Sequence, residues 1–310
     1  MAQKIIIGTR GSQLAMTQTE SVAARLRAVN PGFEVSIIRI VTKGDTNQRV
    51  PLEQVAGEGI FVKELEEALL EGQIDLAVHS LKDMPTQLPS GLCLSAVLER
   101  VNPADVLVTK GQKLANLPSG ASIGTGSVRR AAQLTTYRPD LKAVSIRGNV
   151  DTRLSKVASG ELDGVILAAA GLKRLGWEDR ITEYLPIERF LPMVGQGVLA
   201  IESRIDELTC CRIAASLNHL PTWQSITAER AFLRTLAGGC KAPIAALGAV
   251  TGASLVLDGM VMDVKANKVL RGSEAGTIRQ SEEIGVRLAK RLLAAGANKF
   301  LSPPVKSESW

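Results

Sequence analysis

The chain has 310 residues, of which 45% are hydrophobic and 22% charged, and its net charge is +6. This length exceeds one ordinary core and predicts two or three domains, and the composition is that of a globular protein, which excludes a disordered chain. Only 3% of the residues are aromatic, so we expect no stacking platform for single-stranded nucleic acid. No apolar run is long enough to span a membrane, and the first ten residues lack a signal-peptide core. We therefore expect a soluble cytoplasmic protein.

The first third of the chain predicts strands that alternate with helices. A β-rich run at 4–8 leads into a glycine turn at 9–12 and then an amphipathic helix to about residue 28, with Ser12 as its N-cap. A strand is expected over 35–41, a helix over 60–70 and a third strand over 75–80.

The middle third repeats this order. A strand is expected over 121–124, a glycine turn over 125–127, a helix over 128–137, strands over 144–147 and 164–169, and a helix over about 150–158. GTRGS at 8–12 and GTGS at 124–127 thus open similar strand–turn–helix units, which predicts two α/β domains of similar build. The free N–H groups at each helix start can bind a carboxylate or phosphate, although such a turn is also ordinary capping chemistry.

The last third predicts a return to the first domain and then a third domain. The glycine-containing segment 192–197 and a strand over 198–202 indicate a crossover. A helix from about 221 to 236, strand-like runs up to about 270 and a helix over 281–295 indicate a small α+β domain. We expect domain 1 over 1–98 and 198–217, domain 2 over 102–193 and domain 3 over 220–310.

The positive charge is concentrated in one segment. Residues 122–174 hold nine Lys or Arg against four Asp or Glu, so this segment either binds an anionic partner or forms a solvated face. Six arginines are expected at strand ends or in early helical turns: Arg10, Arg129, Arg130, Arg147, Arg153 and Arg174. Because a guanidinium group binds a carboxylate through paired hydrogen bonds, a ligand with several carboxylates fits best. A nucleic-acid groove is the alternative, but no recognised nucleic-acid-binding motif supports it.

Two further positions could carry chemistry. Asp83 follows Lys82 just after a predicted strand, where α/β proteins bind ligands. This pair is either an exposed ion pair of little energetic weight or a carboxylate kept ionised to stabilise a cationic intermediate. Cys240 lies between two glycines and a lysine, which admit a bulky group and favour the reactive thiolate.

The other cysteines have no such context. A lone cysteine is usually inert and buried, which is our interpretation of Cys93, Cys210 and Cys211 in their apolar or helical surroundings. The cysteine and histidine spacing fits no zinc site, and a disulfide framework is not expected in a chain of this size.

Several motifs together resemble one family. HSLKDMP (79–85), GTGSVRR (124–130), SIRGNVDTRL (145–154), ILAAAGLKRLG (166–176), LPMVGQG (191–197) and GGCKAP (238–243) stand in the order found in hydroxymethylbilane synthases, also called porphobilinogen deaminases. The resemblance covers essentially the whole chain. It implies a cytoplasmic, monomeric α/β protein with two domains like those of type II periplasmic binding proteins and a small α+β C-terminal domain. It also implies a transferase that condenses four porphobilinogen molecules, releases ammonia at each addition and forms 1-hydroxymethylbilane, the linear precursor of haem.

The resemblance also implies roles for particular residues. Cys240 would hold a covalent dipyrromethane cofactor through a thioether, and Asp83 would be the catalytic carboxylate. The carboxylates of the cofactor and of the growing pyrrole chain would be bound by Arg10, Ser12, Ser80, Lys82, Thr125, Ser127, Arg129, Arg130, Arg147, Gly148, Asn149, Arg153, Ala168 and Arg174. Gln18 and Gln196 would line the cleft and Phe61 would cover it. No metal, nucleic acid or membrane is implied.

The chain departs from the family pattern in places. Gln54 and Glu58 stand where lysines are frequent, and Gly126 replaces a common serine, which removes one possible hydrogen bond to the cofactor. Gly11, Gln13 and the pair at 241–242 also differ from the usual residues. The alternative function is a non-catalytic binding protein on the same two-domain scaffold, in which the Gly-Gly-Cys segment would have no role.

Overall fold

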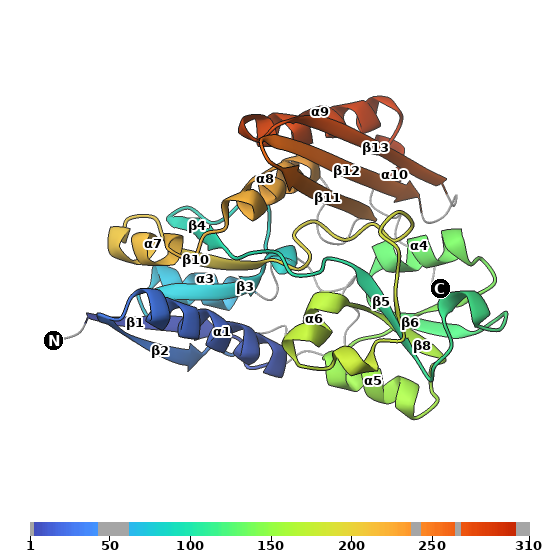
Figure 1. The fold of residues 1–310 in the computed structure, drawn as a ribbon, viewed down its shortest axis with the longest axis horizontal. Helices are drawn as coiled ribbons and strands as arrows, with labels where there is room; N and C mark the ends of the chain where they lie inside the picture. The colour runs from blue at the N-terminus through green and yellow to red at the C-terminus, as the bar shows by residue number, and fades with distance from the viewer. Residues whose placement is uncertain (1–2, 43–61, 237–242, 264–267, 302–310) are drawn as a thin grey trace.

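The computed structural model describes residues 3–42, 62–236, 243–263 and 268–301. Within them the strands form two five-stranded sheets and one three-stranded sheet. Figure 1 shows the two larger sheets side by side, with the three-stranded sheet and its helices above them. We call the two larger units lobe 1 and lobe 2 and the smaller one the third unit.

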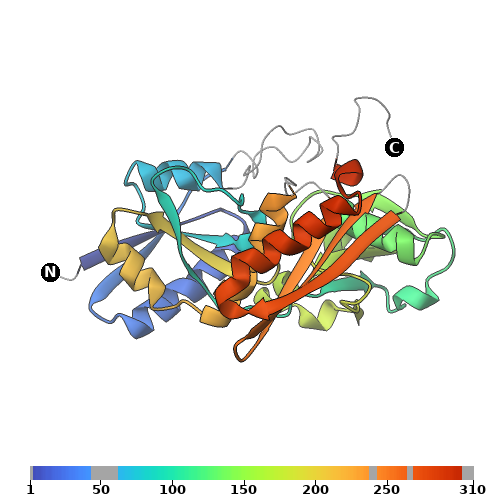
Figure 2. The same cartoon turned by 90° about the horizontal axis from the view of Figure 1, so that it is seen from above.

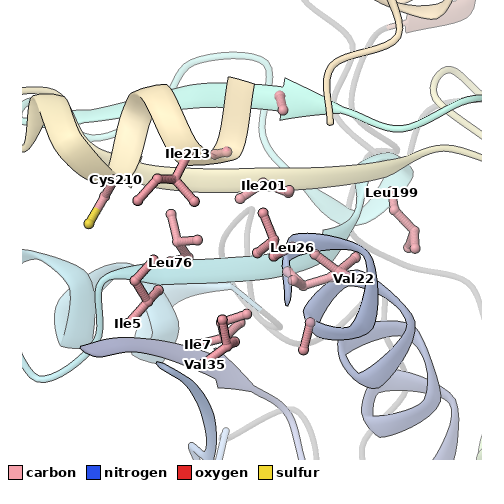
Figure 3. Close-up of a cluster of buried hydrophobic side chains, with 14 of the residues drawn as sticks. Ile5, Ile7, Val22, Leu26, Val35, Leu76, Leu199, Ile201, Cys210 and Ile213 are labelled. Atoms are coloured by element: carbon pink, nitrogen blue, oxygen red, sulfur yellow. The ribbon is translucent and has the colours of Figure 1, made fainter. Parts of the chain in front are cut away.

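Lobe 1 is built on a sheet with the strand order β2-β1-β3-β10-β4. Its strands are β1 (Gln3–Thr9), β2 (Phe33–Arg39), β3 (Leu76–Ser80), β4 (Leu92–Val97) and β10 (Leu199–Arg204). Helices α1 (Gln13–Val29) and α7 (Leu208–Ala215) pack on one face through an apolar cluster that includes Leu26, Ile201 and Ile213 (Figure 3). Helix α3 (Lys63–Leu70) packs in a separate cluster with Ala77 and Leu92. Both faces of this sheet are therefore covered, and ligands are restricted to the strand ends.

Lobe 2 repeats this plan with the strand order β7-β6-β8-β5-β9. Its strands are β5 (Asp105–Thr109), β6 (Ser122–Thr125), β7 (Lys142–Ser145), β8 (Gly164–Ala168) and β9 (Glu183–Tyr184), and its helices are α4 (Val128–Tyr137), α5 (Val150–Ala158) and α6 (Ala169–Arg174). In each lobe one strand lies between two parallel neighbours, β1 between β2 and β3 and β6 between β7 and β8. An antiparallel strand follows in each sheet, β10 beside β3 and β5 beside β8. The predicted pair of similar α/β units is confirmed.

The third unit packs two helices on one face of an antiparallel sheet. The strands are β11 (Ile244–Thr251), β12 (Ser254–Asp263) and β13 (Lys268–Thr277), and the helices are α8 (Leu220–Thr235), α9 (Ser281–Ala294) and the short α10 (Asn298–Leu301). Phe232 of α8 and Leu288 of α9 share its apolar core, and Figure 2 shows α9 lying along the sheet. Met260 and Met262 of β12 pack with Ala132 and Leu191 of the second lobe. The predicted α+β C-terminal part is confirmed.

Several predicted boundaries were wrong. The strands expected over 35–41 and 144–147 occupy 33–39 and 142–145, where they pair in register with β1 and β6, so Arg147 lies beyond its strand. Among the described residues the helix expected over 60–70 begins at Lys63. Strands β4, β5 and β9 and helices α6 and α7 were not predicted. One reason is that β8 and α6 share a single apolar run, 164–172, which by itself does not show where a strand ends and a helix begins.

Candidate functional site

A cavity of about 420 Å³ lies between lobe 1 and lobe 2 at the ends of β1, β3, β6 and β8. The described residues that the sequence analysis assigned to the site line this cavity, with the exception of Thr125: Arg10, Ser12, Gln18, Ser80, Lys82, Asp83, Ser127, Arg129, Arg130, Arg147, Gly148, Asn149, Arg153, Ala168, Arg174 and Gln196. Cys240, Phe61, Gln54 and Glu58 lie outside the described residues. The fold thus brings together side chains that are spread over most of the sequence.

The two glycine turns deliver two helix N-termini to this cavity. The Ser12 side chain accepts a hydrogen bond from Ala15 N (3.3 Å) and caps α1, and the Ser127 side chain accepts one from Arg130 N (3.4 Å) and caps α4. The remaining N–H groups of each first turn and the positive end of the helix dipole favour an anion at the cavity. Thr125 is buried behind its turn, where its hydroxyl accepts a hydrogen bond from Ser127 N (3.2 Å). Thr125 is the last residue of β6 and supports the turn that presents Ser127, and its contact with a bound carboxylate stays a prediction.

Asp83 and Lys82 lie in a 3₁₀ turn, Leu81–Asp83, directly after β3. Leu81 N donates to Val198 O (3.0 Å), so this turn is attached to the crossover segment 191–198. Burial lowers the pKa of Lys82 to about 8, an effect that the neighbouring Asp83 carboxylate opposes. The pair is therefore part of the cleft and not an exposed surface ion pair.

The cavity carries a large excess of positive charge. Among the described residues seven Lys or Arg side chains line it, against two Asp. Burial lowers the pKa of Arg153 to about 10, and the adjacent Arg130 acts in the same direction. Burial also lowers the pKa of Arg174 to about 10. Desolvated cations of this kind favour a bound anion, because an anion restores the charge stabilisation that water no longer supplies.

Asp105 was not among the predicted site residues, yet it organises two of the arginines. Its carboxylate at the start of β5 is fully buried and forms ion pairs with Arg129 (2.8 Å) and Arg130 (2.8 Å). Burial alone would raise the pKa of Asp105, but the two guanidinium groups hold it well below its usual range. Part of the charge of Arg129 and Arg130 is therefore already balanced inside the protein. No local signal in the sequence marks Asp105, since its partners are more than twenty positions away.

Gln196 connects the crossover segment 191–198 to segment 98–104, which leads from β4 of lobe 1 to β5 of lobe 2. Its Nε2 donates to Pro103 O (2.6 Å) and to Asp105 Oδ1 (2.9 Å), while its Oε1 accepts from Arg130 Nη2 (3.2 Å). A side chain at Gly197, where φ is +87°, would place its Cβ 2.5 Å from Val101 O. Gly197 thus permits segments 191–198 and 98–104 to approach each other closely, and the hydrogen bonds of Gln196 hold the two segments together.

Arg174 and Gly126 differ from what the sequence suggested. Arg174 is the last residue of α6 and not part of an early turn, and its Nη2 donates to Gly197 O (2.9 Å), which joins lobe 2 to the crossover. A Cβ at Gly126 would lie 2.7 Å from Ile146 O and 3.7 Å from Arg153 Nη2. The local backbone therefore has no room for the serine that is common at this position, and Arg153 takes the adjacent space.

Comparisons with known proteins agree with this geometry. The model of the family described as "Porphobilinogen deaminase, dipyromethane cofactor binding domain" matches residues 5–211, and the "Porphobilinogen deaminase, C-terminal domain" matches residues 223–294. The chain belongs to the porphobilinogen deaminase family. It is accordingly a hydroxymethylbilane synthase, a transferase of tetrapyrrole synthesis with a dipyrromethane cofactor.

Individual relatives support the family over the full length. The chain is 47% identical over 306 residues to the porphobilinogen deaminase of Geobacter metallireducens, covering 99% of this chain and 96% of that one. It is 48% identical over 305 residues to the porphobilinogen deaminase of Geobacter sulfurreducens, covering 98% and 96%. Among solved structures it is similar to the Bordetella pertussis BvgS periplasmic VFT2 domain, with 16% identity, a TM-score of 0.41 and coverage of 69% of this chain and 86% of that chain.

The described residues contain neither a membrane-spanning helix nor a metal-binding cluster. None of the described helices has the length and apolar character needed to cross a membrane. No group of three or more His, Cys, Asp or Glu side chains in the described part of the chain is placed to hold a metal ion.

Proposed function

We propose that the cleft between lobe 1 and lobe 2 binds dipyrromethane and the growing pyrrole chain through their carboxylates, and that Asp83 is the catalytic carboxylate. The observation that carries this proposal is that seven cationic side chains of the described residues line the same cavity as Asp83. Each porphobilinogen ring has two carboxylates, so a chain of linked rings needs a comparable row of guanidinium and ammonium groups. The cavity of about 420 Å³ lies within the usual range for small-molecule sites.

The described residues fit the cofactor. Lys82, Arg147 and Arg153 would hold its carboxylates beside the N-terminus of α4, and Cys240 would attach it through a thioether. When bound, dipyrromethane supplies the pyrrole carbon to which the first substrate molecule is joined. The arginines and the helix N-termini would attract the acidic substituents of the cofactor and so orient it in the cleft.

Contacts on both sides of the Cys240 segment support this attachment. Glu229 of α8, the helix before Cys240, is fully buried and accepts hydrogen bonds from Gly195 N (2.8 Å) and Gly248 N (2.8 Å). Ala246 N of β11, the strand after Cys240, donates to Pro192 O (3.1 Å). Both elements are thus attached to the crossover segment 191–198, of which Gly195 lines the cavity.

The chemistry of this chain's own residues follows from their placement. The arginines orient each substrate by its two acidic groups, which turns an encounter in solution into a reaction between positioned partners. The Asp83 carboxylate stabilises the positive charge that develops on the substrate pyrrole as its amino group leaves as ammonia, and it assists the proton transfers. The Asp83 carboxylate lies close enough to Lys82 and Arg153 to stabilise their charged forms, since it raises the pKa of each against the effect of burial.

Substitution of Asp83 tests the catalytic role. Asp83→Asn keeps the size of the side chain and removes its charge, so turnover of porphobilinogen should fall by a factor of at least about 100, the usual contribution of one positioned acid–base group. Asp151→Asn is the matched control, because Asp151 also lines the cavity but lies exposed at the start of α5. Equal turnover in Asp83→Asn and wild type would contradict the assignment.

An intact-mass measurement tests the attachment. Wild-type protein should carry an added mass on Cys240 and give the colour reaction of pyrroles with an acidic aldehyde reagent. Cys240→Ser should lack both. An unmodified Cys240 in active enzyme would refute the thioether, whereas loss of mass in Cys240→Ser with loss of turnover supports it.

We also propose that the protein acts as a cytoplasmic monomer that binds no nucleic acid, with domain limits at 1–98 and 198–217, 102–193 and 220–310. Pairing of β10 with β3 and β4 supports the discontinuous first domain. Size-exclusion chromatography with light scattering tests the monomer, and a gel shift at physiological salt tests nucleic-acid binding. Anion binding without ammonia release from porphobilinogen would favour the binding-protein alternative.

A further inference from the structure

Two cysteines outside the cleft lie side by side. Cys93 on β4 and Cys211 on α7 are 118 positions apart in the chain, yet their Sγ atoms are 4.0 Å apart. The strand pairing places Cys93 opposite Ser203 of β10. Helix α7, which carries Cys211, begins at Leu208, soon after β10 ends. Neither cysteine lines the cavity between the lobes.

The surroundings of this pair are polar. Cys211 Sγ lies 3.3 Å from Ser203 Oγ, Cys93 Sγ lies 3.5 Å from Ser95 Oγ, and the two serine hydroxyls lie 2.6 Å apart. Hydroxyl groups can donate hydrogen bonds to a thiolate, the form of cysteine that reacts with oxidants. Both cysteines are half-buried, so neither residue is enclosed in the apolar core. We expected these two cysteines to be inert in apolar or helical surroundings; Cys211 does lie on a helix, but the sulfurs of both contact serine hydroxyls.

Cys210, the neighbour of Cys211, provides the contrast. It is buried in the apolar cluster of lobe 1, where Figure 3 shows it among the core side chains with Ile5, Leu76 and Ile213. Burial, with a contribution from Asp75, raises the pKa of Cys210 to about 11. Of these two adjacent residues on α7, Cys210 is thus buried in the apolar core, whereas Cys211 lies beside the thiol of Cys93.

We propose that Cys93 and Cys211 form a dithiol–disulfide site that is oxidised by hydroperoxides. A hydroperoxide converts one thiolate to a sulfenic acid and leaves as the alcohol, or as water when it is hydrogen peroxide. The second thiol then attacks the sulfenic sulfur, forms the S–S bond and expels water. In total two thiols lose two electrons and two protons, and the peroxide O–O bond is reduced.

The geometry permits this bond. The two sulfurs must approach by about 2 Å to reach a disulfide length of about 2.05 Å. Rotation about the Cα–Cβ bond of a cysteine can move its sulfur by a distance of this order. The resulting cross-link joins the edge strand β4 to α7 within lobe 1 and closes a long loop of the chain, residues 93–211, which includes lobe 2.

Peptide mapping of the intact holoenzyme tests the proposal. After treatment with hydrogen peroxide and alkylation of the remaining thiols, we expect a peptide in which Cys93 and Cys211 are linked, and its loss after reduction with dithiothreitol. Cys210→Ser is the matched control and should still form the link, whereas Cys211→Ser should not. Oxidised wild type should also melt at a higher temperature than its reduced form, because the cross-link restricts the unfolded chain, and Cys93→Ser should lack this rise.

The map of wild-type protein decides the outcome without relying on any variant. Cys93 and Cys211 that stay fully alkylatable at peroxide levels that oxidise free glutathione would overturn the proposal. A link through Cys210, or separate sulfinic acids on the two residues, would overturn it as well. The map also resolves Cys240, so the result does not depend on cofactor attachment.

Discussion

Replacement of the buried Asp105 carboxylate tests how the cleft holds its arginines. Asp105 is 0% exposed, and Arg129 and Arg130 are 3% and 6% exposed. Asp105→Asn keeps the shape of the side chain but leaves two buried guanidinium groups without their counter-charge. Removing one partner from a buried ion pair costs about 3–5 kcal/mol. At about 2 °C per kcal/mol for a chain of this size, the melting temperature should fall by roughly 6–10 °C.

Thermal unfolding followed by circular dichroism measures this change. Asp140→Asn is the matched control, because Asp140 pairs with Arg138 at the surface, where solvent screens the interaction, and its melting temperature should stay close to wild type. Because the pKa of Asp105 lies well below its usual range, its contribution is present above the unfolded pKa and is lost only as pH falls through the lower folded value. The difference between Asp105→Asn and wild type should therefore be constant between pH 6 and 8. Equal melting temperatures for the two variants would refute the role given to Asp105.

Three further predictions concern Glu66, Lys82 and Gly124. Burial, with help from Glu202, raises the pKa of Glu66 from 4.5 to about 7, so the native state keeps this proton where the unfolded chain has lost it. The free energy of unfolding should thus decline as pH rises from about 4.5 to 7. Thermal melts of Glu66→Gln across this range should show a smaller decline. The same pH dependence in Glu66→Gln and wild type would contradict the raised pKa of Glu66. Because burial lowers the pKa of Lys82 to about 8 and bound carboxylates raise it again, the KM for porphobilinogen should rise as the pH passes through about 8, where the free enzyme loses the Lys82 proton. In Lys82→Arg the rise should start at a higher pH, and an unchanged pH dependence of KM would contradict the role of Lys82. Gly124→Ala places a Cβ 2.6 Å from a Leu162 methyl group and should cost about 1–3 kcal/mol in chemical denaturation, while Gly11→Ala, which meets nothing within 4 Å, should leave stability unchanged.

Local patterns in the sequence predicted the elements that present the cleft. The helices expected over 128–137 and 150–158 have these bounds in the structure, because capping and apolar spacing act within a few residues. The repeated glycine turns also predicted two similar lobes. Gly8 and Gly124 occupy equivalent places in β1 and β6, where a Cβ would meet side chains of the underlying core at 2.4 Å and 2.6 Å.

The predicted site residues that the structure describes, apart from Thr125, meet in one cavity because the two lobes place strand ends opposite each other. The sequence motifs indicated which arginines belong together, but not how their charges are balanced. Arg129 and Arg130 were expected to bind carboxylates of the ligand, and the structure adds that Asp105, which arrives from another strand, pairs with both.

By itself the sequence determined the fold class, the family and the seven cationic side chains that line the cleft among the described residues, since these depend on local periodicity and on motifs that are continuous in the chain. Only the tertiary structure decided the partners of buried charges and thiols. Cys93 and Cys211 are 118 positions apart, and only the packing of α7 on the sheet of lobe 1 brings their sulfurs together. The physical reason is that ion pairing and thiol contact act over a few ångströms in space, while a sequence pattern records only distance along the chain.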